Sequence, residues 1–326
     1  MHERRLIPRQ HKIRGNMDIG AVVVTYNRLE KLKTALERFD AQIKKPKYII
    51  VVNNNSNDGT REFLDKWVSG TNGDYERKAI HKDINSGGSG GFYTGLEASL
   101  NEDCDWVWVS DDDAYPRADA LKIASDYLDR YAKDFGSTDG ISALCSVVLN
   151  KGVPDPYHSR SIYVSGITIK ERFLKSSDYE KKEFERDNFS YVGSILSKKA
   201  MLKAGLPNKD YFIYCDDTEH AMRMHNYGKI VCLTDMKVDH EAPAETLAES
   251  VTWKTYYCYR NMTDMYRKHF GGIYFWWFAF KIRIKTLLNR LSGGKRQDIT
   301  ILWTAYNDAV AGKFGLHEVY RPGWKL

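Results

Sequence analysis

Short apolar runs alternate with amphipathic stretches over the first part of the chain. Residues 18–25 and 48–52 are continuous apolar runs, which is the pattern of strands covered on both faces. Between them, large apolar residues recur at helical spacing among charged residues over 29–39, which predicts an amphipathic helix. A second helix is predicted after the Asn-, Asp- and Gly-rich turn at 53–60. This order of elements predicts right-handed βαβ units in a doubly wound α/β sheet.

A third apolar run delivers three adjacent carboxylates to the end of a predicted strand. Residues 106–109 are aromatic or β-branched, and Pro116 prevents the strand from continuing. Ligands bind at this carboxyl edge in open α/β sheets, and oxygen ligands suit Mg²⁺ or Mn²⁺. On an extended backbone Asp111 and Asp113 project to one face and Asp112 to the other, so the outer pair is expected to share an ion. An acidic surface turn is the alternative interpretation.

A glycine-rich segment precedes a predicted helix through Leu96 and Leu100. Its glycines allow backbone N–H groups to approach an anion closely, and the helix dipole favours negative charge there. It does not fit the P-loop pattern, because no Gly-Lys-Ser/Thr follows. An anion site and a flexible turn therefore both stay open for this segment.

The middle of the chain continues the α/β pattern with one interruption. A helix is predicted over 118–135, a strand over 140–149 and a short helix over 198–204. Residues 153–188 mix prolines, short β-like pieces and charged residues. We expect a long connection over the site that could close on substrate.

A second group of carboxylates follows an aromatic stretch at 211–215, which is predicted to be a strand. Asp216, Asp217 and Glu219 then fall in the first turn of a helix, where the helix dipole favours negative charge. N-terminal capping explains such residues, but a carboxylate held beside a cleft is also what a general base requires. His240 supplies one imidazole further along the chain.

Composition narrows the class of protein. A chain of 326 residues that is 42% hydrophobic can bury a sizeable core. Its five cysteines are scattered and lack a Cys-x-x-Cys pair, which argues against a disulfide framework or a zinc site and predicts a reducing, cytoplasmic compartment. The sequence has neither an apolar run of the roughly 20 residues that a membrane-spanning helix needs nor a cleavable signal.

The formal charge of +6 is unevenly distributed. Residues 1–16 carry five Lys/Arg and one Glu, and residues 254–296 carry ten Lys/Arg and one Asp. Such basic stripes attract the phosphates of nucleic acid or of anionic lipid. A nucleic-acid-binding protein is disfavoured, because helix-turn-helix, RNP and zinc patterns are absent from the sequence and the acidic strand ends repel phosphate.

An aromatic segment inside the second basic stripe begins at Tyr274, ends at Phe280 and is followed by Lys281, Arg283 and Lys285. Trp and Phe beside Lys and Arg are typical of a helix that lies in the interface of an anionic membrane. Burial of this segment in a homo-oligomer or between domains is the alternative.

Taken together, the motifs resemble those of family-2 inverting glycosyltransferases with the GT-A fold. They occur in the family's order, over roughly residues 17–242: Val-Val-Val-Thr-Tyr-Asn-Arg (22–28), Val-Val-Asn-Asn-Asn-Ser-Asn-Asp-Gly-Thr (51–60), Asn-Ser-Gly-Gly-Ser-Gly-Gly-Phe (85–92), Ser-Asp-Asp-Asp (110–113), Asp-Asp-Thr-Glu (216–219) and Asp-His (239–240). The glycine-rich and Asp-Asp-x-Glu motifs are most similar to the galactofuranosyltransferase and rhamnosyltransferase branch. The resemblance implies a Rossmann-like mixed sheet, Mn²⁺ or Mg²⁺, and a nucleotide-sugar donor, UDP-galactofuranose ahead of dTDP-rhamnose.

The resemblance also assigns roles to individual residues. It implies that Asp217 is the general base, with Asp216 and Glu219 as second choices, and that Asp111, Asp113 and His240 bind the metal. Cys215 stands where the family has tryptophan before the two aspartates. The resemblance also implies which residues bind the donor. These are Thr25, Tyr26, Asn27, Arg28 and Asn54 at the nucleobase, Asn85, Gly87, Gly88, Gly90 and Gly91 along the diphosphate, and Asp111 and Asp112 at the ribose and metal side.

The resemblance divides the chain into a basic arm (1–16), a GT-A domain (17–245) and a C-terminal, mostly helical, basic and aromatic region (246–326). It implies a glycan or lipid-linked glycan acceptor, and hence a peripheral location at the inner face of a bacterial cell membrane. A sugar nucleotidyltransferase shares the metal and aspartate chemistry. It would need a Lys/Arg-rich loop after the first strand, where this chain has only Arg28.

Overall fold

The computed structural model describes residues 17–70, 74–241, 251–291 and 296–324. The strands are β1 (Ile19–Thr25), β2 (Tyr48–Asn53), β3 (Glu76–His81), β4 (Trp106–Asp111), β5 (Ala114–Pro116), β6 (Ile141–Asn150), β7 (Val153–Pro154), β8 (Arg160–Ser165), β9 (Thr168–Phe173), β10 (Glu183–Arg186), β11 (Ser194–Ser197) and β12 (Lys229–His240). The α-helices are α1 (Leu29–Asp40), α2 (Thr60–Ser69), α3 (Gly87–Ser99), α4 (Ala120–Phe135), α5 (Lys198–Ala204), α6 (Asp216–Met224), α7 (Trp253–His269), α8 (Gly272–Leu291) and α9 (Arg296–Val310). Short 3-10 turns are η1 (Pro156–Ser159), η2 (Ser176–Glu180), η3 (Lys209–Tyr211) and η4 (His225–Tyr227).

One mixed sheet runs through the molecule in the order β10-β12-β6-β11-β4-β1-β2-β3. Strands β3, β2, β1 and β4 are parallel to one another, whereas β11 is antiparallel to both β4 and β6. Strand β12 is parallel to β6, and its last residues pair antiparallel with β5. The predicted doubly wound α/β sheet is therefore confirmed, with antiparallel strands in its second half.

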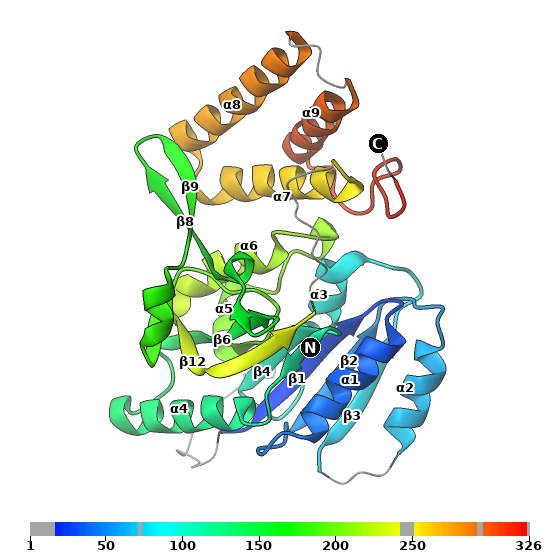
Figure 1. Ribbon diagram of the computed structural model, residues 1–326, viewed down its shortest axis with the longest axis vertical. Helices are drawn as coiled ribbons and strands as arrows, with labels where there is room; N and C mark the ends of the chain where they lie inside the picture. The colour runs from blue at the N-terminus through cyan, green and yellow to red at the C-terminus, as the bar shows by residue number, and fades with distance from the viewer. Residues whose placement is uncertain (1–16, 71–73, 242–250, 292–295, 325–326) are drawn as a thin grey trace, which may run out of the picture.

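Helices cover both faces of this sheet (Figure 1). Apolar side chains of α1, α2 and α4 pack with alternate residues of the strands on one face, and those of α3, α5 and α6 pack on the other. In β1, for example, Val23 faces the first group and Val22 faces the second. Because both faces are buried, these strands have the continuous apolar runs seen in the sequence.

The C-terminal region is helical, as predicted. Helices α7, α8 and α9 lie together beyond one end of the sheet, above α3 and α6 in Figure 1. Tyr256 and Tyr257 of α7 pack with Ile301 and Ala305 of α9 and with Phe212, which belongs to the chain entering α6. No helix in the described residues is long and apolar enough to cross a membrane.

Two sequence predictions about local structure are wrong. Residues 211–215 do not form a strand, because Phe212, Tyr214 and Cys215 have positive φ angles of 67°, 68° and 65°, which break any extended backbone. Their aromatic side chains pack against the C-terminal helices instead of in the sheet. Nor is the backbone extended through the acidic triplet: β4 ends at Asp111 and residues 112–113 form a turn before β5.

Residues 153–188 are more regular than a loop. They contain β7, η1, the β8–β9 hairpin, η2 and β10, which joins the main sheet at its edge. The basic arm 1–16 and the predicted boundary at 245/246 lie outside the described residues, so the three-part division stays a prediction.

Candidate functional site

The ends of β1, β2 and β4 meet at one edge of the sheet, because these strands are parallel neighbours. Thr25 ends β1, and Asp111 ends β4. The pairing of β12 with β5 aligns His240 with Ala114, which puts its imidazole beside Asp113. The fold thus brings polar residues from distant parts of the chain to the carboxyl edge, where open α/β sheets bind ligands.

Two cations, Arg28 just before α1 and Lys31 within it, neutralise the acidic turn that Asp112 and Asp113 form. The Thr25 hydroxyl donates to Asp112 Oδ2 at 2.8 Å, and Arg28 Nη1 lies 3.3 Å from Asp112 Oδ1 and 2.7 Å from Asp113 Oδ2. Lys31 Nζ lies 3.1 Å from Asp113 Oδ2. The prediction that Asp112 points to the opposite face from Asp111 and Asp113 is therefore wrong. The turn brings Asp112 and Asp113 to the same side, where the Arg28 guanidinium contacts both.

The three carboxyl groups have different pKa values because their environments differ. Burial raises the pKa of Asp112 to about 6 against the opposing charge of Arg28. Burial would also raise the pKa of Asp113, but the His240 imidazole, Arg28 and Lys31 together lower it to about 2. The pKa of Asp111 lies well above its ordinary value, first through burial and then through the charges of Asp113 and Asp112. Asp113 is thus the carboxylate that stays ionised most firmly.

Asp113 and His240 have the spacing of two ligands to one ion. Asp113 Oδ1 lies 3.4 Å from His240 Nε2. Donors at about 2.1 Å from one ion lie roughly 3.0 to 4.2 Å apart, so this pair fits. The other carboxylate oxygen of Asp113 faces Arg28 and Lys31, which leaves Oδ1 and the imidazole as the metal-facing atoms. The predicted ligands Asp113 and His240 therefore lie together, with Asp111 on the adjoining strand end.

The glycine-rich segment begins α3 and is tied to the end of β2 by Asn54. Asn54 Nδ2 donates to Asn85 Oδ1 and to the Gly87 carbonyl, each at 2.9 Å, and Asn54 Oδ1 accepts from the Ser86 backbone N–H at 3.1 Å. A Cβ at Gly88 would meet nothing within 4 Å. The first turn of α3 is therefore held in place while Gly88 faces open space, as an anion site at a helix N-terminus requires.

Tyr26 and Asn27, which were predicted to bind the nucleobase, make none of these contacts. Tyr26 is 41% exposed. Asn27 has a φ of 52°, and its backbone N–H donates to the Ser56 hydroxyl while its Oδ1 accepts from the Asn57 backbone N–H. These interactions order the turns after β1 and β2, and the contacts of Tyr26 and Asn27 do not connect them to the aspartates.

The second carboxylate group lies in the first turn of α6, where it was predicted. Burial raises the pKa of Asp217, with the charge of Arg160 opposing, and burial together with the Asp217 charge raises the pKa of Asp216 to about 7. Asp216 also acts on Asp111 electrostatically, so the two acidic groups face the same region. The positive charge of Arg160 thus favours the ionised form of Asp217.

Glu219 is unsuited to act as a base. Arg223 Nε lies 2.9 Å from Glu219 Oε1, and His269 Nε2 lies 3.1 Å from the same oxygen. These partners overcome burial and lower the pKa of Glu219 to about 2. A carboxylate so engaged is a poor proton acceptor, which leaves Asp217 and Asp216.

Arg260 and Asn261 of α7 hold the chain that leads into α6. The Asn261 side-chain amide nitrogen lies 2.9 Å from each of the carbonyl oxygens of Tyr211, Ile213 and Tyr214. Arg260 Nη2 donates to the Tyr211 carbonyl at 2.9 Å. Both side chains are fully buried, so their polar groups are committed to this segment.

Sequence reasoning missed several residues of the site. Lys31 lies one helical turn after Arg28, and that spacing was a usable signal. Asp155 and His158, whose ligand atoms lie within 4.8 Å of that of His240, offered another through their three-residue spacing. Arg160, at the start of β8, opposes the burial-driven rise in the pKa of Asp217 through its charge, and no local pattern predicts that interaction.

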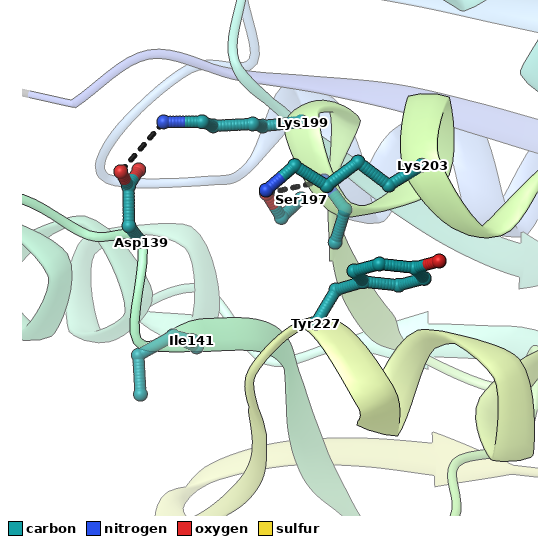
Figure 2. Close-up of a pocket in the computed structure, with 7 residues that line it drawn as sticks. Asp139, Ile141, Ser197, Lys199, Lys203 and Tyr227 are labelled. Atoms are coloured by element: carbon teal, nitrogen blue, oxygen red, sulfur yellow. Dashed lines mark hydrogen bonds and ion pairs between the residues drawn. The ribbon is translucent and has the colours of Figure 1, made fainter.

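A small cavity of about 20 Å³ lies elsewhere (Figure 2). Lys199 Nζ bridges to Asp139 Oδ2 at 2.6 Å beside Tyr227 there. Ile141, which lines the cavity, is the first residue of β6 and pairs with Lys229, the first residue of β12. His240 is the last residue of β12, so the cavity lies at the other end of that strand. The cavity is too small for a nucleotide and lies away from the aspartates.

Comparison with known proteins adds independent findings. The family model described as Glycosyl transferase family 2 matches residues 21–193, just over half of the chain. Galactofuranosyltransferase GlfT1 of Mycobacterium tuberculosis (strain ATCC 25618 / H37Rv) is 27% identical over 213 residues, 64% of this chain and 65% of that protein. GlfT1 of Mycolicibacterium smegmatis is 36% identical over 98 residues, 30% of each chain. The matched part thus spans less than two thirds of either relative.

Solved structures share the fold at low sequence identity. GalNAc-T7 with UDP, GalNAc and Mn²⁺ has a TM-score of 0.59 at 12% identity, covering 77% of this chain and 48% of that one. S. aureus TarS 1–349 with UDP-GlcNAc has a TM-score of 0.56 at 17% identity, covering 90% and 81%. The mannosyltransferase PcManGT of Pyrobaculum calidifontis with GDP-Man and Mn²⁺ has a TM-score of 0.54 at 15% identity, covering 91% and 75%.

The contacts of Asn261 yield a first prediction. Asn261→Ala removes the donor shared by three carbonyls, of which that of Tyr211 is buried, so we expect the free energy of unfolding in urea to fall by about 1–3 kcal/mol. We also expect kcat to fall, because the released segment leads directly into Asp216 and Asp217. The exposed Asn226→Ala in η4 is the matched control. Equal stability and kcat in the two variants would contradict this role.

The pKa of Asp216 yields a second prediction. Folding raises this pKa from an ordinary 3.8 to about 7, so its stabilising contribution is present below about pH 4 and is lost as pH rises through about 7. Asparagine does not titrate, so the Asp216→Asn variant does not lose stability in this way. The free energy of unfolding of the variant minus that of the parent, measured in urea, should therefore increase from pH 5 to pH 8. The exposed Asp134→Asn should show no such trend. A pH-independent difference for Asp216→Asn would refute the shift.

Proposed function

The chain belongs to glycosyl transferase family 2, and from that premise we propose that it is an inverting galactofuranosyltransferase that uses UDP-galactofuranose. The acceptor in this proposal is a hydroxyl of a cell-surface glycan, carried on a lipid. Both mycobacterial relatives are described as galactofuranosyltransferases, which supports the donor sugar. Two of the structural neighbours, GalNAc-T7 and TarS, were solved with UDP or UDP-GlcNAc, which supports the nucleotide.

Asp217 is the proposed general base. It would accept the proton of the acceptor hydroxyl while the oxygen attacks the anomeric carbon and the bond to the diphosphate breaks on the opposite face of the sugar. The Arg160 charge favours the ionised, proton-accepting form of Asp217 against its burial. Proton transfer of this kind contributes about 10²- to 10⁴-fold to the rate. Burial raises the pKa of both neighbours, and we assign the base to Asp217 because the Arg160 charge opposes that rise there.

We place the leaving diphosphate of this proposal at the first turn of α3. Gly88 leaves room there, and the N-terminal end of the helix favours negative charge. Arg28 and Lys31 add positive charge beside Asp113. A Mn²⁺ or Mg²⁺ ion held by Asp113 and His240, with Asp111 adjacent, would supply further neutralisation of the diphosphate charge.

One observation carries the proposal: acidic groups far apart in sequence converge at the carboxyl edge of the sheet. Asp113 contacts His240 there, and Asp111 interacts with Asp216 next to the proposed base. A sugar-nucleotide transfer needs a charge-neutralising site for the diphosphate and a base for the acceptor. This edge supplies both.

A donor assay with an Asp217 variant gives the third prediction. We expect transfer to a lipid-linked glycan acceptor from UDP-galactofuranose and none from dTDP-rhamnose. Asp217→Asn should lower kcat by at least about 10²-fold while UDP affinity, measured by calorimetry, stays within a few-fold, since the base acts only on the acceptor. Exposed Asp134→Asn is the control. Transfer from dTDP-rhamnose alone would reject the donor, and near-normal turnover of Asp217→Asn would reject the base.

Helix α8 supports a membrane surface as the place of this reaction. Its exposed apolar side chains recur along one helical stripe: Ile273, Trp276, Phe280, Ile284, Leu287, Leu288 and Leu291. Lys281 and Lys285 line a hollow of about 400 Å³ with Trp277 and Phe280. Exposed apolar residues bordered by lysines fit the interface of an anionic leaflet, so we place the enzyme in the cytoplasm at the inner face of a bacterial membrane. Burial in a homo-oligomer is the rival.

Liposome flotation gives the fourth prediction. Trp276→Ser with Leu288→Ser removes two exposed apolar anchors, so the fraction that floats with phosphatidylglycerol vesicles should fall at least about tenfold. Leu202→Ser, which changes an exposed leucine on α5, is the control. Flotation equal to that of the control would exclude α8 as the membrane contact.

A further inference from the structure

The connection between β6 and β8 brings two ligand-type side chains to His240. Asp155 lies just before η1 and His158 lies within it, more than 80 residues before His240 in sequence. The His158 ring packs edge-to-face on the His240 ring, with centroids 5.0 Å apart. His240 therefore has Asp113 beside Nε2 and His158 against its ring.

The donor atoms of Asp155, His158 and His240 all lie within 4.8 Å of one another. Asp155 Oδ2 lies 3.9 Å from His158 Nε2, which is too long for a hydrogen bond but within the roughly 3.0 to 4.2 Å that separates two ligands of one ion. This spacing is therefore compatible with a metal ion shared by Asp155 and His158.

The metal-facing nitrogen of His240 is fixed by its surroundings. The His240 side chain is 90% buried, and its Nε2 atom faces Asp113 Oδ1. Because one imidazole binds one ion through one nitrogen, Nε2 is the atom that a cation shared with Asp113 would use.

The two added side chains are held in place by other contacts. The Asp155 backbone N–H donates to the Val148 carbonyl at 2.9 Å, and Asp155 Oδ1 accepts from the Tyr157 backbone N–H at 2.9 Å. Arg186 Nη2 donates to the His158 carbonyl at 2.6 Å. Asp155 Oδ2 and the His158 ring remain outside these bonds, so the backbone is fixed while the ligand atoms face His240.

We propose that Asp155 and His158 bind the divalent cation together with His240, so that the protein supplies two imidazoles to the ion. The use of this ion in catalysis rests on the proposed function, but its binding does not. Two imidazoles and a carboxylate favour Mn²⁺, Co²⁺ or Zn²⁺ over Mg²⁺, which prefers oxygen ligands. The connection 153–188, expected to lie over the site, thereby becomes part of its metal centre.

The test counts nitrogen ligands on Mn²⁺ in the whole chain. Pulsed EPR of the protein with one equivalent of MnCl₂ should show two coupled imidazole nitrogens, one of which disappears in His158→Ala. Mn²⁺ titration should show at least about tenfold weaker binding in His158→Ala and in Asp155→Asn. His225→Ala, which removes an exposed histidine on η4, should keep both nitrogens and the parent affinity.

The outcomes separate this inference from the proposed function. A single imidazole on Mn²⁺ in the unaltered protein overturns the inference, whether or not the variants fold, and leaves sugar transfer untouched. Unchanged Mn²⁺ affinity in folded His158→Ala and Asp155→Asn overturns it as well. Two imidazoles without turnover of any nucleotide sugar would support the metal site and reject the proposed function.

Discussion

The geometry of the site depends on a strained segment that α7 holds in place. Phe212, Tyr214 and Cys215 occupy left-handed backbone conformations that side chains other than glycine rarely adopt. Such strain persists only when surrounding contacts compensate for it. Here Asn261 and Arg260 supply those contacts by hydrogen bonding to carbonyls on both sides of Phe212. The C-terminal helices therefore determine where α6, and with it the proposed base, begins.

The same segment connects the base to the glycine-rich start of α3. The Phe212 carbonyl accepts a hydrogen bond from the Ser89 backbone N–H at 3.2 Å. A Cβ at Gly87 would lie 1.9 Å from that carbonyl oxygen, so only glycine fits there. The Asp217 helix and the proposed diphosphate site are thus joined through one rigid piece of backbone. That connection sets the distance between the two reacting partners, which a transfer reaction needs to control within about an ångström.

Local patterns in the sequence predicted the parts of the fold that depend on local physics. The apolar runs of β1, β2 and β4 and the acidic first turn of α6 were correctly located, because burial on both faces and the helix dipole leave signatures within a few residues. Residues 211–215 were predicted as a strand because aromatic residues favour strands. Their conformation is instead imposed by Asn261, nearly 50 residues later. A contact of that kind has no local signature.

The role of residues 153–188 could be foreseen only in outline. Their length and composition suggested a connection near the site, and the structure shows that His158 reaches His240 and Arg160 acts on Asp217. Both interactions result from the tertiary placement of η1 and the β8–β9 hairpin. The sequence showed the residue types but had no information on which distant side chains they would meet.

Charge compensation explains how three adjacent aspartates are tolerated in a buried turn. Isolated carboxylates there would repel one another and lose hydration. Arg28 and Lys31 bind Asp113 Oδ2, and Arg28 also binds Asp112, so the cations use one side of the turn. Asp113 Oδ1 is left facing His240. Because compensation and ligand binding use different oxygens of the same carboxylate, a cation can bind at His240 without displacing the arginine and lysine that keep the turn folded.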